Sequence, residues 1–440
     1  MIVFQTLLLG LVFGLQPVKL MVTPPVDSVE VRLDGATIGV LAGEPWTVQC
    51  DFGESLRPHE LVAVARDGSG KELGRARQWV NMPRSGAEAT LLLERGPEPH
   101  RVVAARLAWN EVKGTAPKSV RVTLDGKALT IKDPRRFELP PYDPAQAHVL
   151  SAELVFAEGR TARADAAFGG DMGEETQSEL TGVPLVLEPG KKLPALPDLQ
   201  AWFREGDAPL RVFGVEQGPF DVVMILGQEA RTLLAREHGA KGGGAQISER
   251  QVLPPQLLAF DPAGPNDNRL FIAFDVPGFF YGDDNSTHVV FPAYAPMDFV
   301  TSNLRARLAN LAAGPAVLGT PTLADAVASM GALAAANNRP RAVVLLLVRS
   351  REDASRITPA GARRYLEDMH VPLLVWSLLG AGATDGWGTA EDVSSAHRLD
   401  QAAKRLKKTL TAQHIVWLEG AHLPQRLRLT ETVNGVHLAP

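Results

Sequence analysis

The length, composition and charge of the chain are those of an ordinary folded protein with more than one domain. It has 440 residues, of which 45% are hydrophobic and 22% charged, and its net charge is −5, whereas a single core seldom grows beyond about 250–300 residues. This charge gives no sign of nucleic-acid binding, and the single cysteine, Cys50, excludes an internal disulfide and cysteine-rich metal sites.

The first fifteen residues form an apolar run, MIVFQTLLLGLVFGL. The run has the length of a signal peptide and is shorter than the roughly 20 residues of a membrane span, although no Lys or Arg precedes it. We predict a signal peptide over residues 1–20 and an extracytoplasmic chain that is periplasmic, envelope-associated or secreted. The alternative is a buried N-terminal strand. Membrane contact is expected only through this segment, if it is not cleaved.

An internal repeat marks the next part of the chain. Residues 29–35 (VEVRLDG) return as residues 119–126 (SVRVTLDG), and His59 is echoed by His148. Short alternating segments separated by turn residues favour antiparallel strands, and the period of the repeat approaches the size of an immunoglobulin-like domain. We predict two immunoglobulin-like β-sandwich modules, over residues 25–112 and 118–190.

The pattern changes after residue 190. Residues 191–209 begin with a Pro-rich stretch, which predicts an extended linker. Apolar strands without polar alternation then follow, at residues 220–226, 270–274, 341–348, 371–378 and 414–418. They alternate with segments of helical periodicity, at residues 299–312, 323–336, 359–369 and 389–411. This alternation predicts a doubly wound α/β (Rossmann-like) domain over residues 210–420, followed by a β hairpin over 421–440.

Three landmarks make this half resemble the von Willebrand factor A domain, in its secreted bacterial branch called acidobacterial VWFA-related. They are residues 220–226 (FDVVMIL), 319–327 (GTPTLADAV) and 343–350 (VVLLLVRS), in the order of the family. The resemblance covers residues 210–420 and implies an α/β domain that binds proteins. In the family, the loops at these landmarks form a metal-ion-dependent adhesion site, where Mg²⁺ keeps a position open for a ligand carboxylate.

The metal ligands of the family are missing from this chain. Its Asp-x-Ser-x-Ser motif is replaced by GQEAR at residues 227–231, its Thr ligand by Pro321, and its Thr-Asp-Gly by VRS at residues 348–350. An arginine about 4 Å from a divalent cation would repel it by roughly 8 kcal/mol at an effective dielectric constant of about 20. We therefore predict a degenerate site without metal or cofactor. Its candidate binding residues are Gly227, Glu229, Arg231, Thr320, Thr322, Arg349 and Ser350.

The sequence leaves three arrangements open for these loops. Glu229 could form an ion pair with Arg349 or Arg231. The two arginines could instead form an anion or carboxylate pocket at the N-terminal end of the first helix. In the third arrangement they point into solvent.

The function predicted from these features is binding rather than catalysis. The sequence lacks the G-x-S-x-G, H-E-x-x-H and C-x-x-C signatures. We predict a non-enzymatic, metal-independent protein–protein interaction or adhesion and scaffold protein of the cell envelope or exterior, with an unidentified protein partner and no nucleic acid. The alternative is a small anionic-ligand-binding or enzyme-associated subunit that uses Arg231 and Arg349. A purely structural, self-associating chain is a third hypothesis, and the sequence does not give the oligomeric state.

Overall fold

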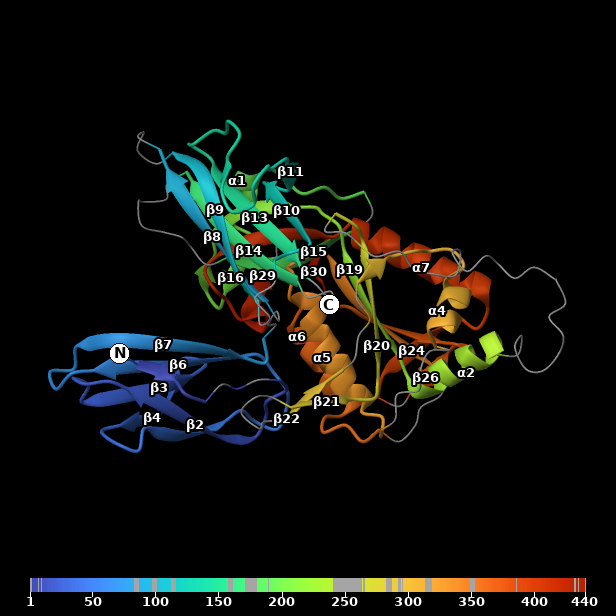
Figure 1. The fold of residues 1–440 in the computed structure, drawn as a ribbon, viewed down its shortest axis with the longest axis horizontal. Helices are drawn as coiled ribbons and strands as arrows, with labels where there is room; N and C mark the ends of the chain where they lie inside the picture. Colours follow the sequence, from blue (N-terminus) through green and yellow to red (C-terminus); the bar gives the residue numbers. More distant parts are fainter. Residues whose placement is uncertain are drawn as a thin grey trace.

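Most of the chain is covered by the computed structural model. It describes residues 2–6, 8, 10–82, 87–96, 101–111, 116–156, 161–170, 180–188, 190–239, 263, 266–281, 287–291, 294, 296–312, 319–348, 353–384, 386–430, 433 and 435–439. Among them, 44% lie in strands and 18% in α-helices. Figure 1 shows an N-terminal sandwich in blue, a second sandwich in cyan and green, and a region of helices and strands on the other side.

Two antiparallel sheets form the first sandwich. One contains β1 (Ile2–Phe4), β2 (Leu15–Val22) and β5 (Thr47–Asp51), and the other contains β4 (Ala36–Leu41), β3 (Ser28–Leu33), β6 (His59–Arg66) and β7 (Glu72–Val80). The apolar run that predicted a signal peptide belongs to this sandwich: Ile2, Leu8 and Val12 are buried in its core. Within the described part of this run, β1 covers Ile2–Phe4 and β2 begins at Leu15, and a signal peptide over residues 1–20 stays a prediction.

The second sandwich begins earlier in the chain than predicted. One of its sheets contains β12 (Phe137–Glu138), β9 (Val102–Glu111) and β8 (Ala87–Arg95), and the other contains β11 (Lys127–Leu129), β10 (Ser119–Leu124), β13 (Ala147–Val155) and β14 (Thr161–Gly169). Leu91 and Leu107 share a core with Leu150 and Phe168. The predicted boundary between residues 112 and 118 is therefore wrong, because β8 and β9 pack in the second module.

Strands from distant parts of the chain form a third group. One sheet contains β18 (Val212–Glu216), β28 (His414–Glu419), β15 (Leu180–Leu187) and β30 (Val436–Leu438), and a smaller one contains β17 (Ala208–Pro209), β16 (Phe203–Glu205) and β29 (Leu427–Leu429). The predicted linker packs here, since α1 (Leu196–Leu199) and β16 bury Leu199 and Phe203 against Val416. The predicted C-terminal hairpin is wrong, because β29 pairs with β16 and β30 with β15. A 3-10 turn, η2 (Pro424–Arg426), precedes β29.

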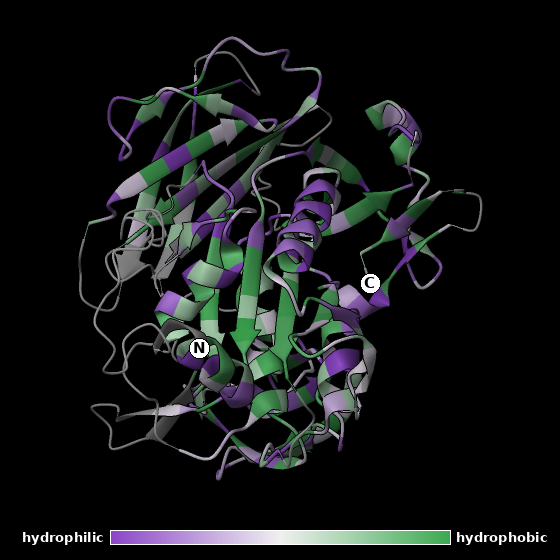
Figure 2. Cartoon of the chain, turned by 90° about the vertical axis from the view of Figure 1, so that its right-hand side faces the viewer, coloured by the Kyte–Doolittle hydropathy of each residue, from purple (hydrophilic) through white to green (hydrophobic). Residues whose placement is uncertain are grey.

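A seven-stranded sheet lies beside this group. Its order is β23 (Met297–Asp298), β20 (Arg269–Phe274), β19 (Asp221–Leu226), β24 (Arg341–Leu347), β25 (Leu373–Ser377), β27 (Gly388–Asp392) and β26 (Gly382–Thr384), and β20 through β27 are parallel. One face packs on α2 (Gln228–Gly239), α4 (Leu304–Ala312) and α7 (Ala396–Thr411), and the other on α5 (Leu323–Ala335) and α6 (Pro359–Asp368). Figure 2 shows these apolar strands in green between the helices. A separate hairpin contains β21 (Gly278–Tyr281) and β22 (Thr287–Val290).

The predicted fold class is therefore wrong. It placed two separate sandwich modules before a self-contained doubly wound α/β (Rossmann-like) domain over residues 210–420. Strands instead outweigh helices, 44% to 18% of the described residues, and they form many small sheets. β18 and β28 lie within that range but share a sheet with β15 and β30 from outside it. Apolar patterning shows which segments are buried, but it does not show which sheet they join.

No helix in the described part of the chain combines the length and the apolar character that a membrane-spanning helix requires.

Candidate functional site

The carboxyl ends of the parallel strands lie where the sequence predicted a degenerate metal site. β19 ends at Leu226 and α2 begins at Gln228, so Gly227 alone forms the turn between them. The N–H of Gly227 donates to the carbonyl of Leu346 at 3.3 Å, which fixes this turn against β24. We call the groups gathered here the carboxyl-edge site: Gly227, Gln228, Arg231, Asp275, Thr322 and Asp353.

Asp275 is the central residue of this site, and the sequence reasoning missed it. It directly follows β20 and is only 4% exposed. Its Oδ2 accepts the N–H of Gln228 at 2.8 Å, at the first turn of α2. Its carbonyl accepts the N–H of Thr322 at 2.7 Å, next to the start of α5. One aspartate therefore connects two helix N-termini to the sheet. The signal in the sequence was an acidic residue at the end of an apolar strand (FIAFD).

The charge of Asp275 depends on pH near neutrality. Burial raises the pKa of its carboxyl to about 6, and the nearby charge of Asp353 acts in the same direction. The hydrogen bond from Gln228 and the charge of Arg231 oppose this increase in pKa without cancelling it. The carboxyl-edge site therefore gains a negative charge as the pH rises through about 6.

The first turn of α5 is held by a second carboxylate that the sequence reasoning missed. Asp353 accepts the N–H of Leu323 at 2.8 Å and the N–H of Ala324 at 2.9 Å, one on each carboxylate oxygen. The side chain of Thr322 makes no hydrogen bond to the described residues through its buried Oγ1. Thr320 precedes it on the exposed side of the loop. Of the two threonines, only Thr322 is thus part of the carboxyl-edge site.

The charged residues that the sequence predicted for this site are Arg231, Glu229 and Arg349, and the structure describes the first two. The guanidinium of Arg231 lies over the Phe274 ring, 4.5 Å from its centroid, which is the geometry of a cation–π contact. Glu229 is half-buried in the first turn of α2. Arg349 and Ser350 lie outside the described residues, so an ion pair between Glu229 and Arg349, or an anion pocket formed with Arg349, stays a prediction.

The carboxylates of this edge do not fit the Mg²⁺ site that the family resemblance implies. Both oxygens of Asp353 and one oxygen of Asp275 already accept backbone N–H groups. A hard cation in a protein requires several free oxygen ligands. Within the ranges that the structure describes, no three His, Cys, Asp or Glu side chains are grouped so that they could hold a metal ion.

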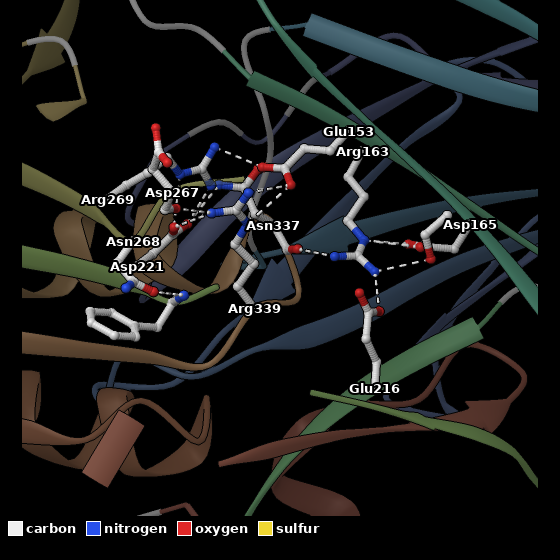
Figure 3. A network of polar contacts seen from close by, with 12 residues as sticks. Glu153, Arg163, Asp165, Glu216, Asp221, Asp267, Asn268, Arg269, Asn337 and Arg339 are labelled. Atoms are coloured by element: carbon white, nitrogen blue, oxygen red, sulfur yellow. Dashed lines mark hydrogen bonds and ion pairs between the residues drawn. The ribbon is translucent and has the colours of Figure 1, made fainter. Parts of the chain in front are cut away.

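The opposite end of the same strands carries a buried ion-pair network, drawn in Figure 3. Asp221 begins β19 and is fully buried; it accepts hydrogen bonds from Arg269, at 2.8 and 2.6 Å, and from Arg339 at 3.2 Å. Both arginines also pair with Glu153 of the second sandwich, at 2.7 Å for Arg269 and 2.6 Å for Arg339. Two carboxylates and two guanidinium groups thus neutralise one another. We call this the amino-edge network.

A second branch extends the contact between the sandwich and the sheets. Arg163 of β14 pairs with Asp165 at 2.9 Å and with Glu216 of β18 at 3.0 Å. It also donates to the carbonyl of Asn337 at 3.1 Å and lies 4.8 Å from the ring centroid of Trp417. Breaking a buried pair leaves an uncompensated charge, which is strongly unfavourable. This branch therefore fixes the second sandwich against the sheet of β18, while the amino-edge network fixes it against the parallel sheet.

The repeated histidines form the same clasp in both sandwiches. Nδ1 of His59 lies 2.7 Å from Oδ2 of Asp34, and Nδ1 of His148 lies 2.7 Å from Oδ2 of Asp125. Both aspartates adopt left-handed backbone angles, with φ of 55° and 50°. The sequence repeat therefore encodes a structural turn that is fastened to the neighbouring strand.

Comparisons with known proteins give only weak structural matches to the chain. No protein-family model matches it, and no curated protein does either. The fibronectin(III)-like modules of CbhA from Clostridium thermocellum are 15% identical to this chain, with a TM-score of 0.16. The match covers 18% of this chain and 93% of the CbhA chain. The central fibronectin-III array of a RIM-binding protein is 11% identical, with coverages of 46% and 82% and a TM-score of 0.20.

A similar match is found with a bacterial surface protein. The pilus adhesin SpaC from Lactobacillus rhamnosus GG, in its open conformation, is 10% identical, and the match covers 85% of this chain but only 48% of SpaC, with a TM-score of 0.22. At scores this low neither fold nor function follows from the likeness, so the function proposed below rests on the geometry of the chain itself.

Proposed function

We propose that the chain is a non-enzymatic adhesion or scaffold protein that presents the carboxyl-edge loops to a protein partner without a metal ion. The amino-edge network carries this proposal, because it joins the second sandwich to the parallel sheet through fully buried ion pairs. The sandwich and the parallel sheet would therefore keep one relative position when a partner binds the loops, as flexibly linked domains would not.

The surroundings of the loops support a binding role. Gln228 and Thr320 are exposed at the carboxyl edge, whereas the groups beneath them are held by hydrogen bonds to backbone N–H groups. A preorganised surface loses little conformational entropy when a partner binds. A location outside the cytoplasm agrees with such a role and is part of the proposal. The relationship to von Willebrand A domains stays a prediction from the three sequence landmarks.

Site-specific photo-crosslinking tests the proposed binding face. Benzoylphenylalanine would replace Gln228 or Thr320 in the full chain, and Lys404, an exposed residue of α7, in a control. Crosslinking would be performed in cells that naturally make the protein. We expect a discrete protein adduct from both edge positions, none from position 404, and no change on addition of EDTA. Equal adducts from the control, no adduct from either edge position, or loss of the adduct with EDTA would contradict the proposal.

A further inference from the structure

A pocket of about 620 Å³ opens between the second sandwich and the sheet of β15, β18, β28 and β30. Its walls come from the turn after β10, the start of β13, the segment after β15, and strands β18 and β28. Small-molecule sites have volumes of about 300–1,000 Å³ and occur preferentially at junctions between domains. The pocket therefore has both the size and the position of a ligand site, and it lies away from the carboxyl-edge site.

One side of the pocket is apolar. Val149, Phe213 and Trp417 are buried in the small core that joins the sandwich to the sheet, and they also line the pocket. Leu193 and Leu196 face it from the Pro-rich segment that the sequence predicted as a linker. Leu193 and Leu196 are only half-buried, so an apolar molecular body that enters the pocket would remove their remaining surface from water, which is favourable in proportion to the area buried.

The acidic groups of the pocket already have basic side chains as partners. Asp125 is paired with His148 at 2.7 Å, and Glu216 is paired with Arg163 at 3.0 Å. The second ring nitrogen of His148 lies 2.7 Å from the carbonyl of Asp143, so both of its nitrogens are engaged. These carboxylates therefore attract a further cation only weakly.

Two lysines add an uncompensated positive charge. Lys191 and Lys192 are adjacent in the Pro-rich segment, line the pocket and are exposed at its rim. Among the residues that the structure describes, neither ammonium group has an ion-pair partner. A positively charged binding surface attracts negatively charged ligands and discriminates against positively charged ones.

We propose that this pocket binds a small organic anion, namely a carboxylate with an apolar body. The carboxylate lies between Lys191 and Lys192, and the body contacts Leu193 and Leu196. The assignment is independent of the proposed protein-binding face, because none of its residues belongs to the carboxyl-edge site.

Calorimetric titration of the full chain tests the site with 1-naphthoate as the probe. Its neutral and cationic analogues, 1-naphthylmethanol and 1-naphthylmethylamine, report the dependence on charge. The variant Lys191→Ala/Lys192→Ala should weaken naphthoate binding by roughly tenfold, as expected for the loss of two partly exposed charge contacts. Its matched control is Lys404→Ala/Lys407→Ala, which removes two exposed lysines of α7 outside the pocket and should leave binding unchanged.

A second variant tests the apolar half of the pocket. Ala147→Trp places a large side chain at a lining position and should abolish binding while both lysines remain, with folding checked by thermal unfolding. The proposal is contradicted if naphthoate does not bind at millimolar concentration, if 1-naphthylmethanol binds as tightly, or if the control variant loses as much affinity as the Lys191→Ala/Lys192→Ala variant.

Discussion

Asp221 and Asp275 lie at opposite ends of neighbouring parallel strands and have different partners. At the amino edge, Asp221 is paired with two arginines; burial alone would raise its pKa, but Arg269 and Arg339 hold it below the usual value. At the carboxyl edge, Asp275 accepts a backbone N–H and has no ion pair among the described residues, and burial raises its pKa to about 6. The amino edge is thus permanently charged and structural, while the carboxyl edge changes its charge near neutral pH.

The largest expected effect concerns the amino-edge network. Asp221→Asn keeps the shape of the side chain but leaves Arg269 and Arg339 with one carboxylate fewer, and the loss of one partner of a buried pair costs about 3–5 kcal/mol. Urea denaturation at pH 7 would measure the decrease in the free energy of unfolding. The control Glu72→Gln breaks the exposed pair with Arg75 and should have far less effect. Equal effects of the two variants would contradict the structural role of the network.

The second prediction uses the raised pKa of Asp275. A carboxyl whose pKa is higher in the folded state stabilises the fold while it is protonated, and this contribution is lost as the pH rises through about 6. A shift of about two pKa units corresponds to about 3 kcal/mol. Relative to the wild type, Asp275→Asn should therefore gain roughly 2–3 kcal/mol of stability between pH 4 and pH 8. Parallel pH profiles of the two proteins would show that Asp275 does not have the raised pKa.

A smaller effect is expected at the start of α5. Asp353→Ala removes the acceptor of the Leu323 and Ala324 N–H groups, and loss of a helix cap costs about 1–2 kcal/mol. Hydrogen exchange should accelerate in the first turn of α5 and stay unchanged in α7, which has its own cap at Ser395. Unchanged exchange at Leu323 and Ala324 would show that Asp353 does not hold this turn.

The smallest predicted change tests the hypothesis about Glu229. If its carboxylate forms an ion pair in the degenerate loops, Glu229→Ala should lower the free energy of unfolding by up to about 1 kcal/mol, as is usual for partly exposed pairs. A melting temperature equal to that of the wild type would eliminate the ion pair.

The sequence located the strands of the parallel sheet but not the way in which the sheets combine. Continuous apolar runs predicted residues 220–226, 270–274 and 341–348, and the structure has β19, β20 and β24 there. Residues 414–418 were also correctly predicted as a strand. That strand, β28, pairs with β15, which lies more than two hundred residues earlier in the chain. Local periodicity carries no information about such a distant partner.

The sequence predicted that the loops after the apolar strands lie together, but it did not predict which groups hold them. The family resemblance directed attention to the positions of its metal ligands, which are replaced here. Asp275 and Asp353 lie outside those positions, although each is an acidic residue near a strand or helix end. The partners within the amino-edge network come from separate sheets, so no spacing in the sequence connects Glu153 to Asp221 or Arg339.

Thermal unfolding of the full chain in EDTA, and with millimolar Mg²⁺, Ca²⁺ or Mn²⁺, tests most directly whether the carboxyl edge works without a metal. A ligand that binds only the folded state stabilises it by about 2.7 kcal/mol at roughly a hundredfold excess over its dissociation constant. We predict the same melting temperature under all conditions, because the carboxylates of this edge are bound to backbone N–H groups. A clear increase with any of these metals, absent in the Asp275→Asn variant, would contradict the account and assign a metal site to the carboxyl edge.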